Sequence, residues 1–80
     1  MLDGIPKEKV IVGVKQTKKA LKEKQALKVI IADDAQNHVV DPIIEVCNND
    51  GVIVEHIDSM EKLGKAVKID VGAAVVTILK

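Results

Sequence analysis

The uninterrupted apolar run Val29-Ile30-Ile31-Ala32 constrains the fold more than any other feature of the sequence. Its valine and isoleucines are β-branched, which favours a strand, and no polar side chain alternates with them. A strand of this kind has to be covered on both faces, as at the centre of a layered α/β sheet. The run therefore predicts a domain in which helices pack against both sides of a sheet.

The rest of the chain alternates between strand-like and helix-like segments. We predict strands at residues 10–12, 29–32, 52–57 and 73–79. We predict helices at residues 14–23, from the Asp41-Pro42 pair to about Asp50 before Gly51, and after Asp58, whose spacing to Glu61 resembles a capping box. This order predicts an α/β fold, a three-layer α/β/α sandwich around a small four-stranded sheet, formed by one domain over residues 1–80.

Composition limits what such a domain can bind. Hydrophobic residues make up 48% of the 80 residues, yet there is no Phe, Trp or Tyr. The core is therefore compact and aliphatic, with little interior volume for a deep substrate pocket. No nucleic-acid base can stack on an aromatic ring, so any binding of RNA has to use polar, backbone and aliphatic contacts.

Charge is strongly segregated although the formal net charge is zero. Residues 1–28 carry eight lysines and three acids, residues 29–61 carry eight acids and no lysine, and residues 62–80 carry four lysines and one acid. A folded chain with this asymmetry can attract phosphate on one side. Because the sequence contains no arginine, its positive charges act as points and not as bidentate clamps.

The predicted helix after Gly13 is the most informative segment for function. Its lysines (Lys15, Lys18, Lys19 and Lys22) fall between roughly 40° and 140° on a helical wheel, opposite the apolar side. Its first turn also has free backbone N–H groups and the positive end of the helix dipole, which suit phosphate and base-edge acceptors. Gln16 can donate and accept at once. Taken alone, the same pattern is more often an ordinary solvated face on an amphipathic helix.

Other candidate sites carry weaker signals. Asp33 and Asp34 follow a strand and could bind a metal or act as an acid–base pair, although a strand-end turn or cap is the favoured interpretation. His38, Cys47 and His56 match no zinc spacing, and Cys47 lies on the apolar side of its predicted helix as a buried, inert thiol. We therefore expect no catalytic residue, no metal and no cofactor.

Localisation is predicted from the same sequence. A single cysteine cannot form an internal disulfide, and Met1 is followed by a polar start without a signal-peptide core. The longest nearly apolar run, Val71 to Leu79, is too short to cross a bilayer. We expect a cytoplasmic protein without a membrane partner.

Three separated motifs resemble the kink-turn-binding ribosomal protein family, which includes the large-subunit proteins "seven-Ae" and "thirty-e" and short bacterial members. The motifs are residues 13–21 followed by 29–35, then Leu63-Gly64-Lys65-Ala66, then residues 69–74. They cover nearly the whole chain in the expected order. Lys15 and Gln16 stand where the seven-Ae pattern has Asn-Glu, and the Lys-Gln-Thr version is similar to the thirty-e group.

The resemblance implies binding of a kinked RNA with tandem sheared G·A pairs beside a bulge. The positions that would contact RNA are Gly13, Lys15, Gln16, Lys19, Gln36, Ile69, Asp70, Val71 and Gly72. It implies that the first four approach the guanine edges and nearby phosphate. It also implies that Gln36 and the loop 69–72 contact the extruded nucleotide. Without the resemblance, the favoured interpretation of Ile69 and Val71 is as core residues leading into the last strand.

These observations predict a monomeric, non-catalytic protein that binds structured RNA, either ribosomal or regulatory, with the ribosome as a further partner. One alternative is a protein–protein adaptor that uses the acidic segment from Asp33 to Glu61. Another is an enzyme that uses Asp33 and Asp34, or Cys47.

Overall fold

The computed structural model describes residues 4–80, so the first residues of the predicted domain, including the start predicted to lack a signal peptide, lie outside the described residues. The elements are the 3-10 turn η1 (Lys7–Lys9), β1 (Val10–Val12), α1 (Val14–Lys22), β2 (Ala26–Ala32), α2 (Asn37–Asp50), β3 (Ile53–Ile57), α3 (Met60–Ala66) and β4 (Val75–Leu79). Within these residues, no helix is long and apolar enough to cross a membrane.

The strands form one mixed sheet in the order β1-β4-β2-β3. β4 runs antiparallel to both β1 and β2, whereas β2 and β3 are parallel. Val29 and Ile30 in β2 are completely buried, with 0% of their surface exposed. The apolar run is thus an interior strand covered on both faces, as predicted.

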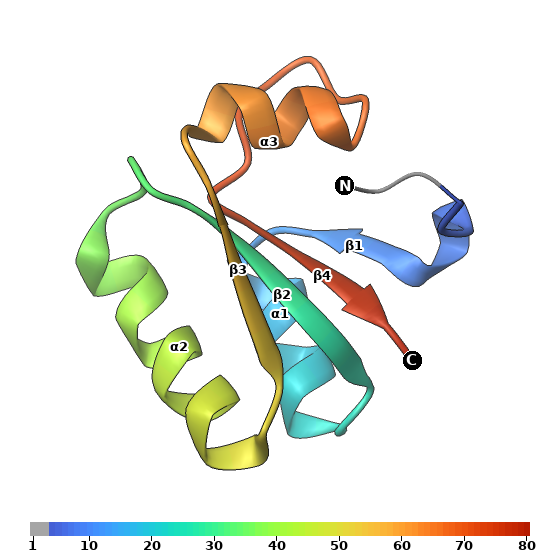
Figure 1. Ribbon diagram of the computed structural model, residues 1–80, viewed down its shortest axis with the longest axis vertical. Coiled ribbons are helices and arrows are strands. Elements are labelled where there is room, and N and C mark those ends of the chain that lie inside the picture. Colours follow the sequence, from blue (N-terminus) through green and yellow to red (C-terminus); the bar gives the residue numbers. More distant parts are fainter. Residues whose placement is uncertain (1–3) are drawn as a thin grey trace.

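Helices lie on both sides of this sheet (Figure 1). α1 and α2 pack against each other and cover one face, on which Thr77 of β4 contacts α1. Val76 and Ile78 alternate with Thr77, face the opposite side and are also buried. α3 packs against β2, β3 and β4 at the end where β2 and β3 finish. The three-layer α/β/α sandwich around a four-stranded sheet is confirmed.

The predicted start of α2 at Asp41-Pro42 is wrong. The helix begins at Asn37 with Gln36 as its N-cap residue, and Pro42 lies inside it. The backbone N–H groups of Val39 and Val40 donate to the Gln36 carbonyl, which closes a turn before the proline. This earlier turn brings Val40 into the core, where it is only 4% exposed, and its burial outweighs the hydrogen bond that the proline cannot donate.

The predicted cap of α3 is also wrong by one residue. The Ser59 hydroxyl accepts a hydrogen bond from the Lys62 backbone N–H at 3.1 Å. Asp58 instead pairs with the Lys62 ammonium at 2.8 Å in solvent. This hydrogen bond and the lysine charge lower the pKa of Asp58. Either serine or aspartate can cap a helix, so the residue types alone did not decide between neighbours.

The last strand begins at Val75 and not at the predicted Ala73. The Ala73 N–H donates to the Met60 carbonyl of α3, which takes this residue out of the sheet ladder. The segment before β4 is therefore attached to α3, and this attachment determines where the loop 69–72 lies.

Gly64 of α3 allows this segment to approach closely. A Cβ built on Gly64 would overlap the carbonyl oxygen of Val71 and lie 3.2 Å from the Cα of Gly72. Gly64 is buried, and Ile69 N–H donates to its carbonyl oxygen at 3.0 Å. Backbone thus packs directly on backbone, which only glycine permits at this position.

A buried hydrogen bond joins α1 to the sheet. The Thr77 hydroxyl donates to the Thr17 hydroxyl at 2.7 Å, and neither residue has exposed surface. Because both groups are removed from water, each depends on the other as a partner.

We predict that Thr17→Val lowers the free energy of unfolding by about 1–3 kcal/mol, because it leaves the Thr77 hydroxyl buried without a partner. The double variant Thr17→Val/Thr77→Val should lose much less than the sum of the two single changes, since both polar groups are then removed. Urea denaturation of the four proteins measures this coupling. Additive losses would contradict the prediction.

We predict that Gly64→Ala lowers the free energy of unfolding by about 1–3 kcal/mol, because the added methyl group displaces the Val71 carbonyl. The amide NMR signals of residues 69–72 should shift with it. Lys62→Ala, an exposed change in the same helix, is the matched control and should leave both measurements nearly unchanged. Wild-type stability with unshifted loop signals in Gly64→Ala would disprove the close packing.

Candidate functional site

Backbone hydrogen bonds gather the predicted site segments at one end of the sheet (Figure 1). Gly13 N–H donates to the Val75 carbonyl at 3.0 Å, and Ala32 N–H donates to the Ala74 carbonyl at 3.0 Å. The start of α1, the end of β2 and the segment leading into β4 therefore meet, although they are far apart in the sequence.

α1 begins at this end with an open first turn. Gly13 is its N-cap residue, with φ of 108°, and offers no capping side chain. This φ lies in a region that side-chain-bearing residues rarely adopt, so glycine is required for the chain to turn from β1 into α1. Lys15 and Gln16 follow and are exposed, whereas Thr17 points into the core. The first turn can therefore present backbone donors and two polar side chains to a ligand.

The lysines of α1 give this surface its charge. Lys15, Lys18, Lys19 and Lys22 are exposed, and none of them forms an ion pair within residues 4–80. By contrast, the lysines of α3 are held by acids one helical turn away, in the pairs Lys62–Asp58 and Lys65–Glu61. The uncompensated positive charge of the described helices is thus concentrated on α1, where it can attract phosphate.

The loop 69–72 lines a separate hollow of about 670 Å³, together with Asp34, Met60, Glu61 and Lys65. Val71 is 70% exposed, so the alternative that it is a core residue is wrong. Ile69 is half-buried and packs against the core, so it only partly belongs to the surface. Asp70 and Gly72 are exposed. The loop therefore presents one uncovered aliphatic side chain, Val71, beside exposed backbone.

Gln36 precedes α2 and lines neither the groove beside α1 nor the hollow beside α3. It follows β2 at the same end of the sheet and its side chain makes no capping hydrogen bond to α2, so its exposed amide is free to meet a ligand. Its own carbonyl is used by the first turn of α2, which holds the residue in place.

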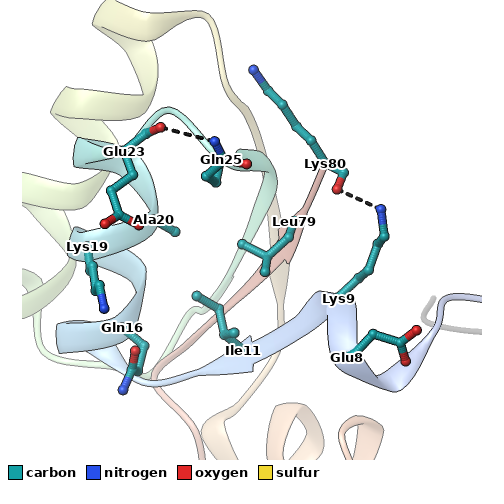
Figure 2. Close-up of a pocket in the computed structure, with 10 residues that line it drawn as sticks. All are labelled: Glu8, Lys9, Ile11, Gln16, Lys19, Ala20, Glu23, Gln25, Leu79 and Lys80. Atoms are coloured by element: carbon teal, nitrogen blue, oxygen red, sulfur yellow. Dashed lines mark hydrogen bonds between the residues drawn. The ribbon is translucent and has the colours of Figure 1, made fainter.

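The structure does not bring Gln16 and Val71 into one hollow. Gln16 and Lys19 line a groove between α1 and β1, drawn in Figure 2, whereas Val71 lines the hollow against α3. A ligand that touched both would have to span the end of the sheet from one side of Gly13 to the other. No sequence motif marks the groove, because its apolar floor comes from three segments that are distant in the sequence.

The acidic candidates have structural partners. The Asp34 carboxylate accepts a hydrogen bond from the Met60 N–H at 2.7 Å and so holds the start of α3, as the cap interpretation predicted. Asp33 lies 3.0 Å from Nδ1 of His56, with both side chains exposed. No group of three residues within 4–80 is arranged to hold a metal ion.

Cys47 of α2 lies in the hydrophobic core of the domain, with 0% of its surface exposed. Burial, and secondarily the charge of Asp50, raises the pKa of its thiol. A thiol that is inaccessible and harder to ionise is a poor nucleophile, which agrees with its prediction as an inert core residue.

The sequence is similar to those of several bacterial proteins that are named RNA-binding proteins. A protein named RNA-binding protein from Geobacillus sp. (strain WCH70) is 51% identical over 72 residues, which cover 90% of this chain and 88% of that protein. RNA-binding protein YbxF from Geobacillus stearothermophilus is 49% identical with the same coverage.

Solved structures give the same picture. The Giardia lamblia 15.5kD RNA binding protein superposes with a TM-score of 0.85 at 30% sequence identity. The match covers 91% of this chain but 62% of that longer protein. A Bacillus halodurans protein of unknown function has a TM-score of 0.83 at 22% identity, which supports the fold alone.

The profile of one family matches residues 6–80, nearly the whole chain, and includes every residue of the candidate site. On these grounds the chain belongs to the Ribosomal protein L7Ae/L30e/S12e/Gadd45 family.

Proposed function

We propose that this protein binds structured RNA without catalysing a reaction, and that it recognises a kink-turn-like internal loop with sheared G·A pairs. The observation that carries the proposal is the meeting of the open, lysine-rich start of α1 with the segment before β4 at one end of the sheet. Names of relatives that include RNA binding support the same class of ligand.

In this proposal each part of the site meets a different part of the RNA. The first turn of α1 offers backbone donors, the Lys15 ammonium and the Gln16 amide to base edges and phosphate. Exposed edges of this kind occur in internal loops and are hidden in the deep groove of an RNA duplex. Val71 packs on an unstacked base, and the exposed Gln36 amide hydrogen-bonds a base edge.

The proposed mechanism is selection of a conformation. The protein binds the kinked form of the RNA better than the extended form, so binding shifts the population towards the kink. Such a role needs neither a metal nor an acid–base pair. Action in the cytoplasm as a monomer, with ribosomal or regulatory RNA as the partner, belongs to the same proposal.

The direct test is a titration with a kink-turn RNA and with a control in which the sheared G·A pairs become Watson–Crick pairs. We expect clear preference for the kink-turn RNA, and affinity for both that falls as salt rises because lysines displace counterions from phosphate. Equal affinity for the two RNAs would reduce the interaction to nonspecific attraction by lysines.

Substitutions should separate base recognition from charge. Gln16→Ala should cost about 1–3 kcal/mol of binding to the kink-turn RNA and narrow the preference between the two RNAs. Lys22→Ala, on the same helix but away from its start, should weaken both RNAs about equally and lower the salt slope by about one. Lys62→Ala serves as the control for a lost lysine outside α1. Identical effects of Gln16→Ala on both RNAs would argue against its role in recognition.

A further inference from the structure

A groove of about 340 Å³ runs between α1 and β1 on the face of the sheet that α1 covers (Figure 2). Its floor is aliphatic and is formed by Ile11 of β1, Ala20 of α1 and Leu79 of β4. Ile11 pairs with Thr77 across the sheet, and Leu79 lies two residues further along β4, so both face the same side as Thr77. α1 packs over the middle of the sheet and leaves the edge strand β1 partly uncovered on this side.

One end of the groove reaches the proposed RNA site. Gln16 and Lys19 lie on the face of α1 that forms one lip, and Figure 2 shows them together near the start of the helix. Glu23 and Gln25 continue this lip away from the site. A strand of RNA that touches the first turn of α1 therefore has a direct path into the groove.

The opposite lip is formed by Glu8, Lys9 and Lys80. The Lys9 ammonium donates to the Lys80 carbonyl at 2.7 Å, so it is held at the rim, and the lysine itself is exposed. With Lys19 on the facing lip, ammonium groups stand on both sides of an aliphatic floor. The Gln16 and Gln25 amides add groups that both donate and accept hydrogen bonds.

We propose that this groove holds one unpaired nucleotide of the RNA internal loop. The base packs on Ile11 and Leu79, a glutamine amide hydrogen-bonds its edge, and the phosphates on its two sides lie near Lys19 on one lip and Lys9 on the other. The volume is at the lower end of the range of about 300–1,000 Å³ usual for small ligands, which suits one nucleotide and not a folded segment. The inference rests on the proposed function, and it adds a second base-binding position on the side of α1 away from Val71.

The test replaces the unpaired nucleotides of a kink-turn RNA one at a time by abasic residues, and measures affinity for wild type, Ile11→Thr and Lys9→Gln. At one unpaired position, loss of the base should weaken wild type about three- to tenfold, less than stacking on an aromatic ring would give. In Ile11→Thr the same base loss should have little effect, because the floor is already impaired. Lys9→Gln should lower the affinity for the intact RNA, because it removes the proposed contact with a phosphate.

A second variant and a charge control complete the test. Lys9→Gln changes an exposed rim residue, so it remains informative if Ile11→Thr destabilises the sheet. Lys62→Gln removes the same charge on α3, outside the groove, and should leave the effects of the abasic residues as in wild type.

The inference is overturned if base loss at every unpaired position costs Ile11→Thr and wild type the same factor, while the kink-turn RNA is still preferred to its Watson–Crick control. Absence of that preference would instead remove the proposed function, and this inference with it. A third outcome is that the base loss has little effect in Val71→Ala and its full effect in Ile11→Thr. That result would place the nucleotide in the hollow lined by Val71 and would also count against the groove.

Discussion

The insertion of β4 between β1 and β2 is the constraint on which the rest of the structure depends. The last strand of the chain completes the sheet, because β1 and β2 do not pair with each other and both bond to β4. The same pairing brings the carbonyl groups of Ala74 and Val75 to the end of β2 and the start of α1. Without β4, β1 would have no partner in the sheet and the segments of the candidate site would not be joined.

The sequence was most informative where a single segment carries its own signal. The apolar run from Val29 predicted an interior strand, and Gly13 followed by spaced lysines predicted α1 and its charged face. Boundaries were less predictable where neighbouring residues compete for a role, as at the caps of α2 and α3. The groove could not be predicted, since Ile11, Ala20 and Leu79 belong to different elements and meet only through the strand order.

Charge is separated in the fold as well as in the sequence. The lysines of α1 have no acidic partner within residues 4–80, whereas the acids after β2 are used locally, with Asp34 holding the start of α3 and Asp33 beside His56. Residues that could have suggested catalysis thus have structural explanations. Among the described residues, no buried side-chain nitrogen or oxygen lacks a hydrogen-bond partner. The polar side chains without a hydrogen-bond partner in the described residues are therefore on the surface.

The hydrogen bond between Thr17 and Thr77 bears on how much conformational entropy the protein itself loses when it binds a ligand. It joins α1 to a central strand one turn beyond the start of the helix, in a site sealed from water. Sliding or turning α1 would leave both hydroxyls buried without a hydrogen-bond partner. The position of α1 on the sheet therefore changes little when a ligand binds. Under the proposed function, the entropy lost in forming the complex comes mainly from the RNA, and affinity depends on how readily each RNA sequence bends by itself.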